Sequence, residues 1–151
     1  MADAYTTALT LLSARELSES QLRARLKRRK IEPDDIEAAV TRLKADRTLN
    51  DRRVALAIAR MESAIKQRGR ARVIQKIRQA GIDGGIAEDA VREVFEEVNE
   101  DELLDRAMQR RLRGTAIADL DERGRARIVR GLAAQGFSLD AIFKRLDQRQ
   151  R

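Results

Sequence analysis

The sequence contains the same five-residue segment twice. Residues 68–72 and residues 123–127 both read RGRAR, 55 positions apart. Apolar residues then recur in steps of four and five at three places: Val73, Ile77 and Ile82; Ile128, Leu132 and Phe137; and, without RGRAR, Leu22, Leu26 and Ile31. A pattern kept at three places indicates internal repeats, and internal repeats favour an array of similar units over a single globule.

The units are predicted to be helical. Apolar residues fall at three- and four-residue steps throughout, the chain has one proline, and no alternating run indicates a strand. We therefore predict an all-α protein of three tandem three-helix repeats. The expected repeats are residues 1–51, with helices near 4–16, 19–30 and 33–46; residues 52–99, with helices near 52–66, 70–80 and 84–98; and residues 100–151, with helices near 100–113, 120–135 and 139–149.

Short local motifs predict several helix ends. Ser18 followed three residues later by Gln21 is a capping-box pattern, which begins a helix. Gly81 and Gly136 stand at equivalent positions, where a glycine in the left-handed conformation ends a helix. Repeat one has Lys30 there instead. Its turn either differs or accepts the strain of a left-handed lysine, about 1 kcal/mol.

The two RGRAR segments lie where the middle helices of repeats two and three begin. Cations are unfavourable at the positive end of a helix dipole, so basic residues there suit a carboxylate or phosphate from a partner. An alternative applies to repeat three, because Asp119 and Glu122 offer an earlier capping box that would leave RGRAR inside the helix. On the first interpretation, repeats two and three do more of the anion binding than repeat one.

Composition excludes most enzyme chemistry. The chain of 151 residues lacks cysteine and histidine, and it contains no nucleotide-, zinc- or calcium-binding motif. Acidic neighbours such as Asp34 and Asp35 point about 100° apart on a helix, so they do not converge on one reacting atom. We predict a protein that is not an enzyme and has no cofactor, metal or small-molecule substrate.

Charge and hydropathy limit which partners and which cellular location are expected. No 18-residue apolar run and no secretory signal occur, so we expect a soluble cytoplasmic protein without a membrane partner. The net charge is +7, although acidic and basic residues are mixed along the chain. The basic middle helices leave open a DNA-binding protein acting directly on DNA, while the few aromatic residues argue against base stacking.

Three segments together resemble the RecX family, regulators of the bacterial recombinase RecA. They are ALTLLSARELSESQLRARLKRRKIEPDDIEAAVTRLKADRTLNDRRVA from Ala8, RGRARVIQKIRQAGI from Arg68, and QGFSLDAIFKRL from Gln135. Leu17 stands where the family often has histidine, and Lys30 replaces a frequent glycine. The resemblance covers nearly the whole chain, and the order of the segments is more specific than any one of them.

The resemblance implies an elongated, curved array of the three repeats. It also implies a regulator of homologous recombination and DNA repair that lies in the groove of the RecA filament on single-stranded DNA and inhibits ATP hydrolysis and strand exchange. A weak direct contact with DNA is compatible with this role. The alternatives are a basic helical protein that acts directly on DNA and a helical adaptor for another acidic protein. The residues expected to contact the partner are Arg25, Arg28, Arg70, Arg72, Lys76, Arg125, Arg127 and Arg130.

Overall fold

The computed structural model describes residues 3–148 of the chain. Between these residues the fold is all-α, with nine α-helices, one short 3₁₀ helix and no strand. The helices are α1 (Ala4–Ala14), α2 (Glu19–Arg28), α3 (Pro33–Ala45), α4 (Asp51–Ala64), α5 (Arg70–Gln79), α6 (Gly84–Glu97), α7 (Glu100–Leu112), the 3₁₀ helix η1 (Ile117–Asp119), α8 (Glu122–Ala134) and α9 (Leu139–Gln148).

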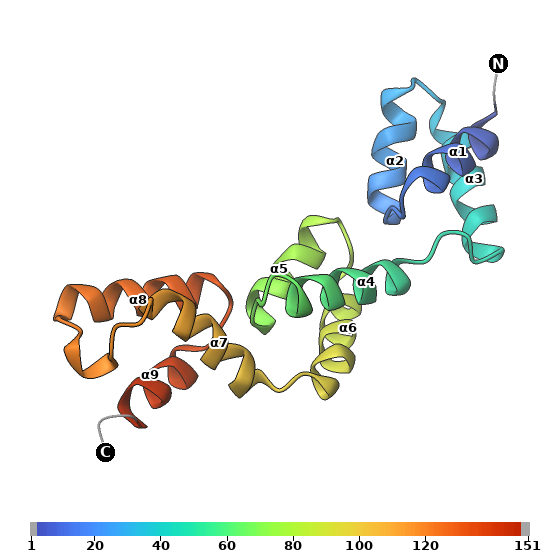
Figure 1. Ribbon diagram of the computed structural model, residues 1–151. Coiled ribbons are helices and arrows are strands. Elements are labelled where there is room, and N and C mark those ends of the chain that lie inside the picture. Colours follow the sequence, from blue (N-terminus) through green and yellow to red (C-terminus); the bar gives the residue numbers. More distant parts are fainter. Residues whose placement is uncertain (1–2, 149–151) are drawn as a thin grey trace.

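The helices form three bundles that follow one another along a curved line (Figure 1). The bundles are α1–α3, α4–α6 and α7–α9, and the two ends of the chain lie at opposite ends of the arch. We call these bundles repeats one, two and three. The prediction of three tandem three-helix repeats in an elongated, curved array is therefore confirmed. The middle helix of each repeat is α2, α5 or α8.

Polar side chains begin most of the helices. Ser18 and Gln21 form the predicted capping box at the start of α2. Pro33 occupies the first turn of α3, where its missing N–H leaves no unsatisfied donor. Side chains that accept a backbone N–H also start other helices; these are Asp3, Asn50, Asp83, Asn99 and Asp121.

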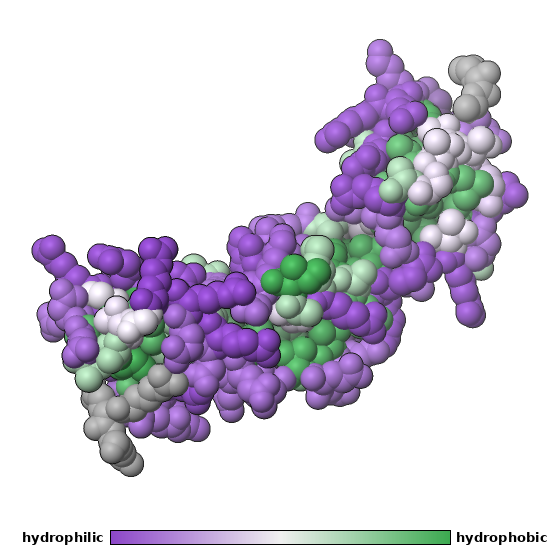
Figure 2. All heavy atoms as spheres, viewed as in Figure 1, coloured by the Kyte–Doolittle hydropathy of each residue, from purple (hydrophilic) through white to green (hydrophobic). Residues whose placement is uncertain are grey.

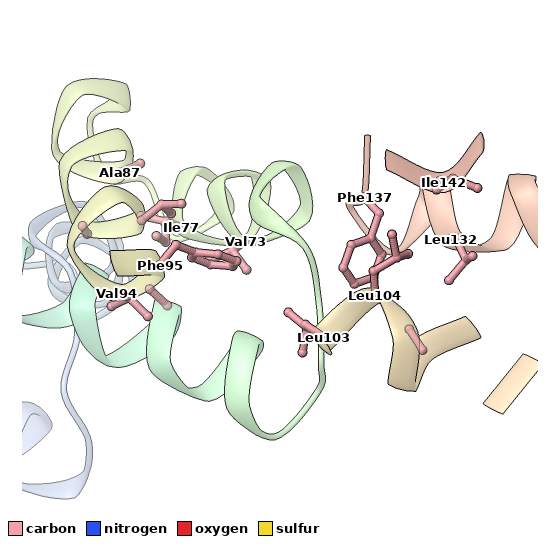
Figure 3. Packing of buried hydrophobic residues seen from close by; sticks show 14 of the residues in the cluster. Val73, Ile77, Ala87, Val94, Phe95, Leu103, Leu104, Leu132, Phe137 and Ile142 are labelled. Carbon is pink, nitrogen blue, oxygen red and sulfur yellow. The ribbon is translucent and has the colours of Figure 1, made fainter. Parts of the chain in front are cut away.

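The buried apolar residues form two separate cores. Repeat one has its own core, which includes Leu22 and Leu26 of α2. A second core runs without interruption through repeats two and three. In Figure 3, Phe95 lies over Val73 and Ile77 on one side, and Phe137 faces Leu104 on the other. Repeats two and three are therefore joined by apolar packing. Burial of apolar surface stabilises the folded state by about 25 cal/mol for each Å² buried.

The residues that end the middle helices adopt the left-handed conformation. Gly81 has a φ of 79° and Gly136 a φ of 108°, which confirms the glycine prediction. At the end of α8 the N–H of Phe137 donates to the carbonyl of Leu132 at 3.2 Å, so the chain folds back over the last turn. Lys30 has a φ of 61°, so repeat one keeps the same turn and accepts the strain of a left-handed lysine.

Candidate partner-binding surface

The start of α5 is joined to the end of α8. The N–H of Gly69 donates to the carbonyl of Gln135 at 3.0 Å, and the N–H of Ala71 donates to the carbonyl of Gly136 at 3.3 Å. A Cβ on Gly69 would lie 2.5 Å from the carbonyl oxygen of Gly136, so only glycine fits. The predicted open anion site at this helix start is therefore wrong, because carbonyls of the chain itself occupy it.

A second junction joins the start of α2 to the end of α5. Ser18 Oγ donates to the carbonyl of Ala80 at 2.5 Å. Ser20 packs closely against Gly81, because a Cβ added at Gly81 would lie 2.5 Å from the Ser20 side chain. Beside this contact, the Asp51 carboxylate accepts the N–H of Glu19 at 2.8 Å. Burial raises the pKa of the Asp51 carboxyl above its ordinary value, and the neighbouring charge of Glu19 adds to that shift.

The middle helices α8, α5 and α2 therefore follow one another head to tail. In each junction, carbonyls at the negative end of one helix accept from donors at the positive end of the next, which is the favourable alignment of helix dipoles. Lys30 ends the last helix of this series, and among residues 3–148 no further repeat packs against its turn. This position explains why lysine is tolerated there, whereas both junction turns carry glycine.

The second RGRAR segment lies inside its helix. α8 begins at Glu122, and Asp121 caps it by accepting the N–H of Gly124 at 2.7 Å. The alternative interpretation for repeat three is therefore the right one, although Asp121 rather than Asp119 is the cap. Because α5 begins at Arg70, in the first RGRAR segment, the two copies are not equivalent sites.

Three of the predicted contact residues take part in interactions within the chain. Arg70 forms an ion pair with Glu100 and lies 5.2 Å from the centre of the Phe95 ring. Arg125 Nη2 lies 2.8 Å from Asp147 Oδ1. Arg72 Nη1 donates to the side chain of Gln75 at 2.5 Å, a neutral partner that leaves the arginine charge uncompensated.

The other five predicted contact residues have no side-chain partner among residues 3–148. Arg28, Arg127 and Arg130 are exposed, and Arg25 and Lys76 are half-buried. All of them lie on the middle helices, and they are Arg25, Arg28, Lys76, Arg127 and Arg130. The structure thus separates the eight residues into Arg70 and Arg125, whose charges are compensated by ion pairs, and six whose charges are not.

Other charges on the middle helices and in the loop before α5 stabilise the fold. Arg23 Nε donates to Glu37 Oε1 at 2.9 Å, and this hydrogen bond lowers the pKa of the Glu37 carboxyl. Arg68, the first residue of its RGRAR segment, points inward and lies 3.2 Å from the buried carboxylate of Glu62. Lys66 approaches the other oxygen of that carboxylate at 3.4 Å. Arg68 therefore fixes the loop before α5 through its ion pair with Glu62, and it is not expected to contact a partner.

A concave surface lined by arginines in repeat three was not predicted from the sequence. Its walls come from the end of α7 and from α8, and its volume is about 470 Å³. We call it the arginine hollow; it is lined by Arg110, Arg111, Arg113 and Arg127, together with Ala107, Ile128 and Gln135. Within the described part of the chain, no acidic residue lines it. A sequence signal exists, because three of these arginines lie within four residues at the end of a predicted helix, without an acid among them.

On the face shown in Figure 2, hydrophilic side chains cover most of repeat three, including the region of α8. Among residues 3–148 there is no group of carboxylates suited to a metal ion. No helix in that range has the length and apolarity needed to cross a membrane.

Comparison with known proteins identifies the family. A model of the first three-helix domain of RecX matches residues 4–43, which include α1, α2 and most of α3. The regulatory protein RecX of Syntrophotalea carbinolica is 34% identical over 142 residues, which are 94% of this chain and 93% of that protein. The chain belongs to the RecX family. A second RecX protein, from Pseudomonas syringae pv. tomato, is 33% identical over 148 residues, covering 95% of this chain and 89% of its own length.

Solved RecX structures have the same fold. The crystal structure of RecX from Lactobacillus salivarius superposes with a TM-score of 0.79 at 24% identity, covering 96% of this chain and 95% of that one. A further crystal structure of a regulatory protein RecX gives a TM-score of 0.82 at 23% identity, covering 96% of this chain and 70% of that one. The RecX relatives are named as regulatory proteins, not as enzymes.

Proposed function

We propose that this chain is a non-enzymatic cytoplasmic regulator of homologous recombination and DNA repair. It binds the RecA filament on single-stranded DNA, lies in the groove of that filament, and inhibits ATP hydrolysis and strand exchange. Membership of the RecX family supports regulation of RecA. The more detailed steps rest on the shape and the charge of the array.

The observation that carries the proposal is the head-to-tail series of middle helices. α8, α5 and α2 run along an arch rather than clustering in a globule (Figure 1), and each carries basic side chains without partners among the described residues. A protein filament presents the same surface at regular intervals. Several modest contacts on one linked chain raise total affinity through effective concentration, so a repeated array suits a repeated partner.

Arginine suits such contacts because its planar guanidinium donates two parallel hydrogen bonds to a carboxylate or a phosphate. The uncompensated basic residues are therefore the ones expected to bind. Arg70 and Arg125 contribute less, because ion pairs with Glu100 and Asp147 already compensate their charges. This shifts the expected contacts toward the residues without an ion pair, which are Arg25, Arg28, Arg72, Lys76, Arg127 and Arg130.

The first experiment measures DNA-dependent ATP hydrolysis by RecA-coated single-stranded DNA while the purified chain is added. We expect the rate to fall as the chain approaches the concentration of filament sites, with strand exchange falling in parallel. An unchanged rate at stoichiometric excess would contradict the proposal.

A second experiment compares two triple variants with the same change in charge. Changing Lys76, Arg127 and Arg130 to alanine should weaken inhibition roughly tenfold or more, because it removes uncompensated cations from the middle helices. The control changes Arg60, Arg92 and Arg106, which lie on α4, α6 and α7, and should inhibit as the unchanged chain does. Circular dichroism checks that both variants keep their helices. Equal inhibition by the two variants would show that these residues of the middle helices do not contribute to the binding surface.

A further inference from the structure

The arginine hollow has the chemistry of an anion site. Four guanidinium groups line it without an acid, so each approaching anion meets uncompensated positive charge. Arg110 and Arg111 lie in the last turn of α7, the negative end of that helix dipole, which stabilises cations there. The hollow is a partly open depression and not an enclosed cavity, which suits a segment of an extended chain better than a small molecule.

Gly131 makes room for one wall of the hollow. It lies inside α8, where its φ is not positive and no turn requires glycine. A Cβ at this position would overlap Arg111 Nη1 and would lie 2.5 Å from Arg111 Cζ. The guanidinium of Arg111 therefore rests directly on the helix backbone, and any larger residue at position 131 would displace it.

A second contact fixes the direction of Arg111. Its Nη2 donates to Gln135 Oε1 at 3.2 Å, and Gln135 Nε2 donates to the carbonyl of Gln67 at 2.8 Å. The main-chain carbonyl of Gln135 also accepts the N–H of Gly69 at 3.0 Å. These neutral partners orient Arg111 without compensating its charge, which is what a binding arginine needs.

The cationic surface continues beyond the hollow. Arg127 also lines a shallower depression on α8, with a volume of about 390 Å³, together with Arg123 and Arg130. Glu122 is the one acid in its lining. Arg127 thus joins the two depressions into one surface with six arginines and one carboxylate.

We infer that this surface binds the sugar–phosphate backbone of single-stranded nucleic acid, independently of base sequence. A nucleic acid carries one negative charge per nucleotide along its whole length, which matches a continuous line of arginines. No aromatic residue lines either depression, so bases have nothing to stack on. The inference deepens the proposed function, on which it rests for its setting, because the strand inside the filament supplies such a backbone.

The test uses the full chain and a fluorescent oligothymidylate, with anisotropy measured at several salt concentrations. We expect Arg111→Ala and Arg127→Ala each to weaken binding roughly threefold to tenfold at low salt. Each should also reduce the slope of log affinity against log salt by about 0.7 for every phosphate that the variant no longer neutralises. Arg60→Ala, an exposed arginine on α4 without a partner among the described residues, is the control and should leave both quantities unchanged.

Gly131→Ala separates binding from folding. Alanine favours a helix more than glycine does, so the unfolding temperature should stay the same or rise, while the displaced guanidinium should weaken oligothymidylate binding as Arg111→Ala does. In an Arg111→Ala background, Gly131→Ala should have no further effect on binding, because the group that it displaces is gone.

Several outcomes would overturn the inference. One is that the unchanged chain fails to bind oligothymidylate at low salt, and another is that Arg111→Ala and Gly131→Ala bind it with unchanged affinity and salt slope. Variants that lose binding to polyglutamate but keep binding to oligothymidylate would assign the surface to an acidic protein segment instead. Inhibition of RecA is measured separately, so a chain that binds oligothymidylate through this surface without inhibiting RecA would contradict the proposed function alone.

Discussion

Glycine at position 136 serves two purposes. Its φ of 108° ends α8, and its lack of a side chain allows Gly69 and Arg72 of the neighbouring repeat to approach. The first purpose is predictable from sequence, because a left-handed residue after a helix is a local matter. The second is not, since Gly69 and Gly136 meet only when two repeats pack together. The sequence leaves two possibilities for the turn at Lys30, a different turn or a left-handed lysine, because the choice depends on whether another repeat packs against that turn.

Gly136→Ala should destabilise the chain more than an ordinary left-handed alanine does. The left-handed conformation costs about 1–2 kcal/mol, and a Cβ 2.6 Å from Gly69 O and Arg72 N adds about 1–3 kcal/mol of overpacking. Gly114→Ala is the matched control, because Gly114 has a φ of 83° and nothing within 4 Å of an added Cβ. Denaturant unfolding measures both free energies. Equal decreases for the two variants would mean that the junction tolerates a side chain.

At the scale of whole elements, helix starts decide how the repeats join. Sequence motifs correctly predicted the start of α2 at the Ser18 capping box, because a cap depends on residues three apart. The starts of α5 and α8 look alike in sequence, yet Asp121 places one of them earlier relative to RGRAR. The partner of the α5 start was unpredictable, since the carbonyls of Gln135 and Gly136 come from a distant part of the chain.

Ser18→Ala should cost more than the removal of a helix cap. Ser18 Oγ accepts the N–H of Gln21 at 3.1 Å, which is worth about 1 kcal/mol as a cap, and donates to the buried carbonyl of Ala80. Leaving that carbonyl unsatisfied adds about 1–3 kcal/mol. Asp121→Ala removes only a cap, at the exposed start of α8, and should cost about 1 kcal/mol. Thermal unfolding of both variants checks the order; similar destabilisation would mean that the Ser18 bond to Ala80 does not stabilise the junction.

At the scale of the molecule, apolar periodicity predicted three bundles but not how their cores connect. Repeats two and three share a core, whereas repeat one has its own, because the continuity of a core depends on how neighbouring repeats pack and not on the periodicity within each repeat. The candidate surface was predictable in part. Arg127 and Arg130 follow from their place on a middle helix, while the arginine hollow needs α7 beside α8 and a glycine at position 131.

The most direct test of groove binding is an electron cryomicroscopy map of the chain bound to a RecA filament on single-stranded DNA. We predict density for the arch lying lengthwise in the groove, with α8, α5 and α2 facing the filament and with contacts from more than one repeat. Density only at the end of the filament, held by a single repeat, or middle helices facing solvent, would contradict groove binding through the middle helices.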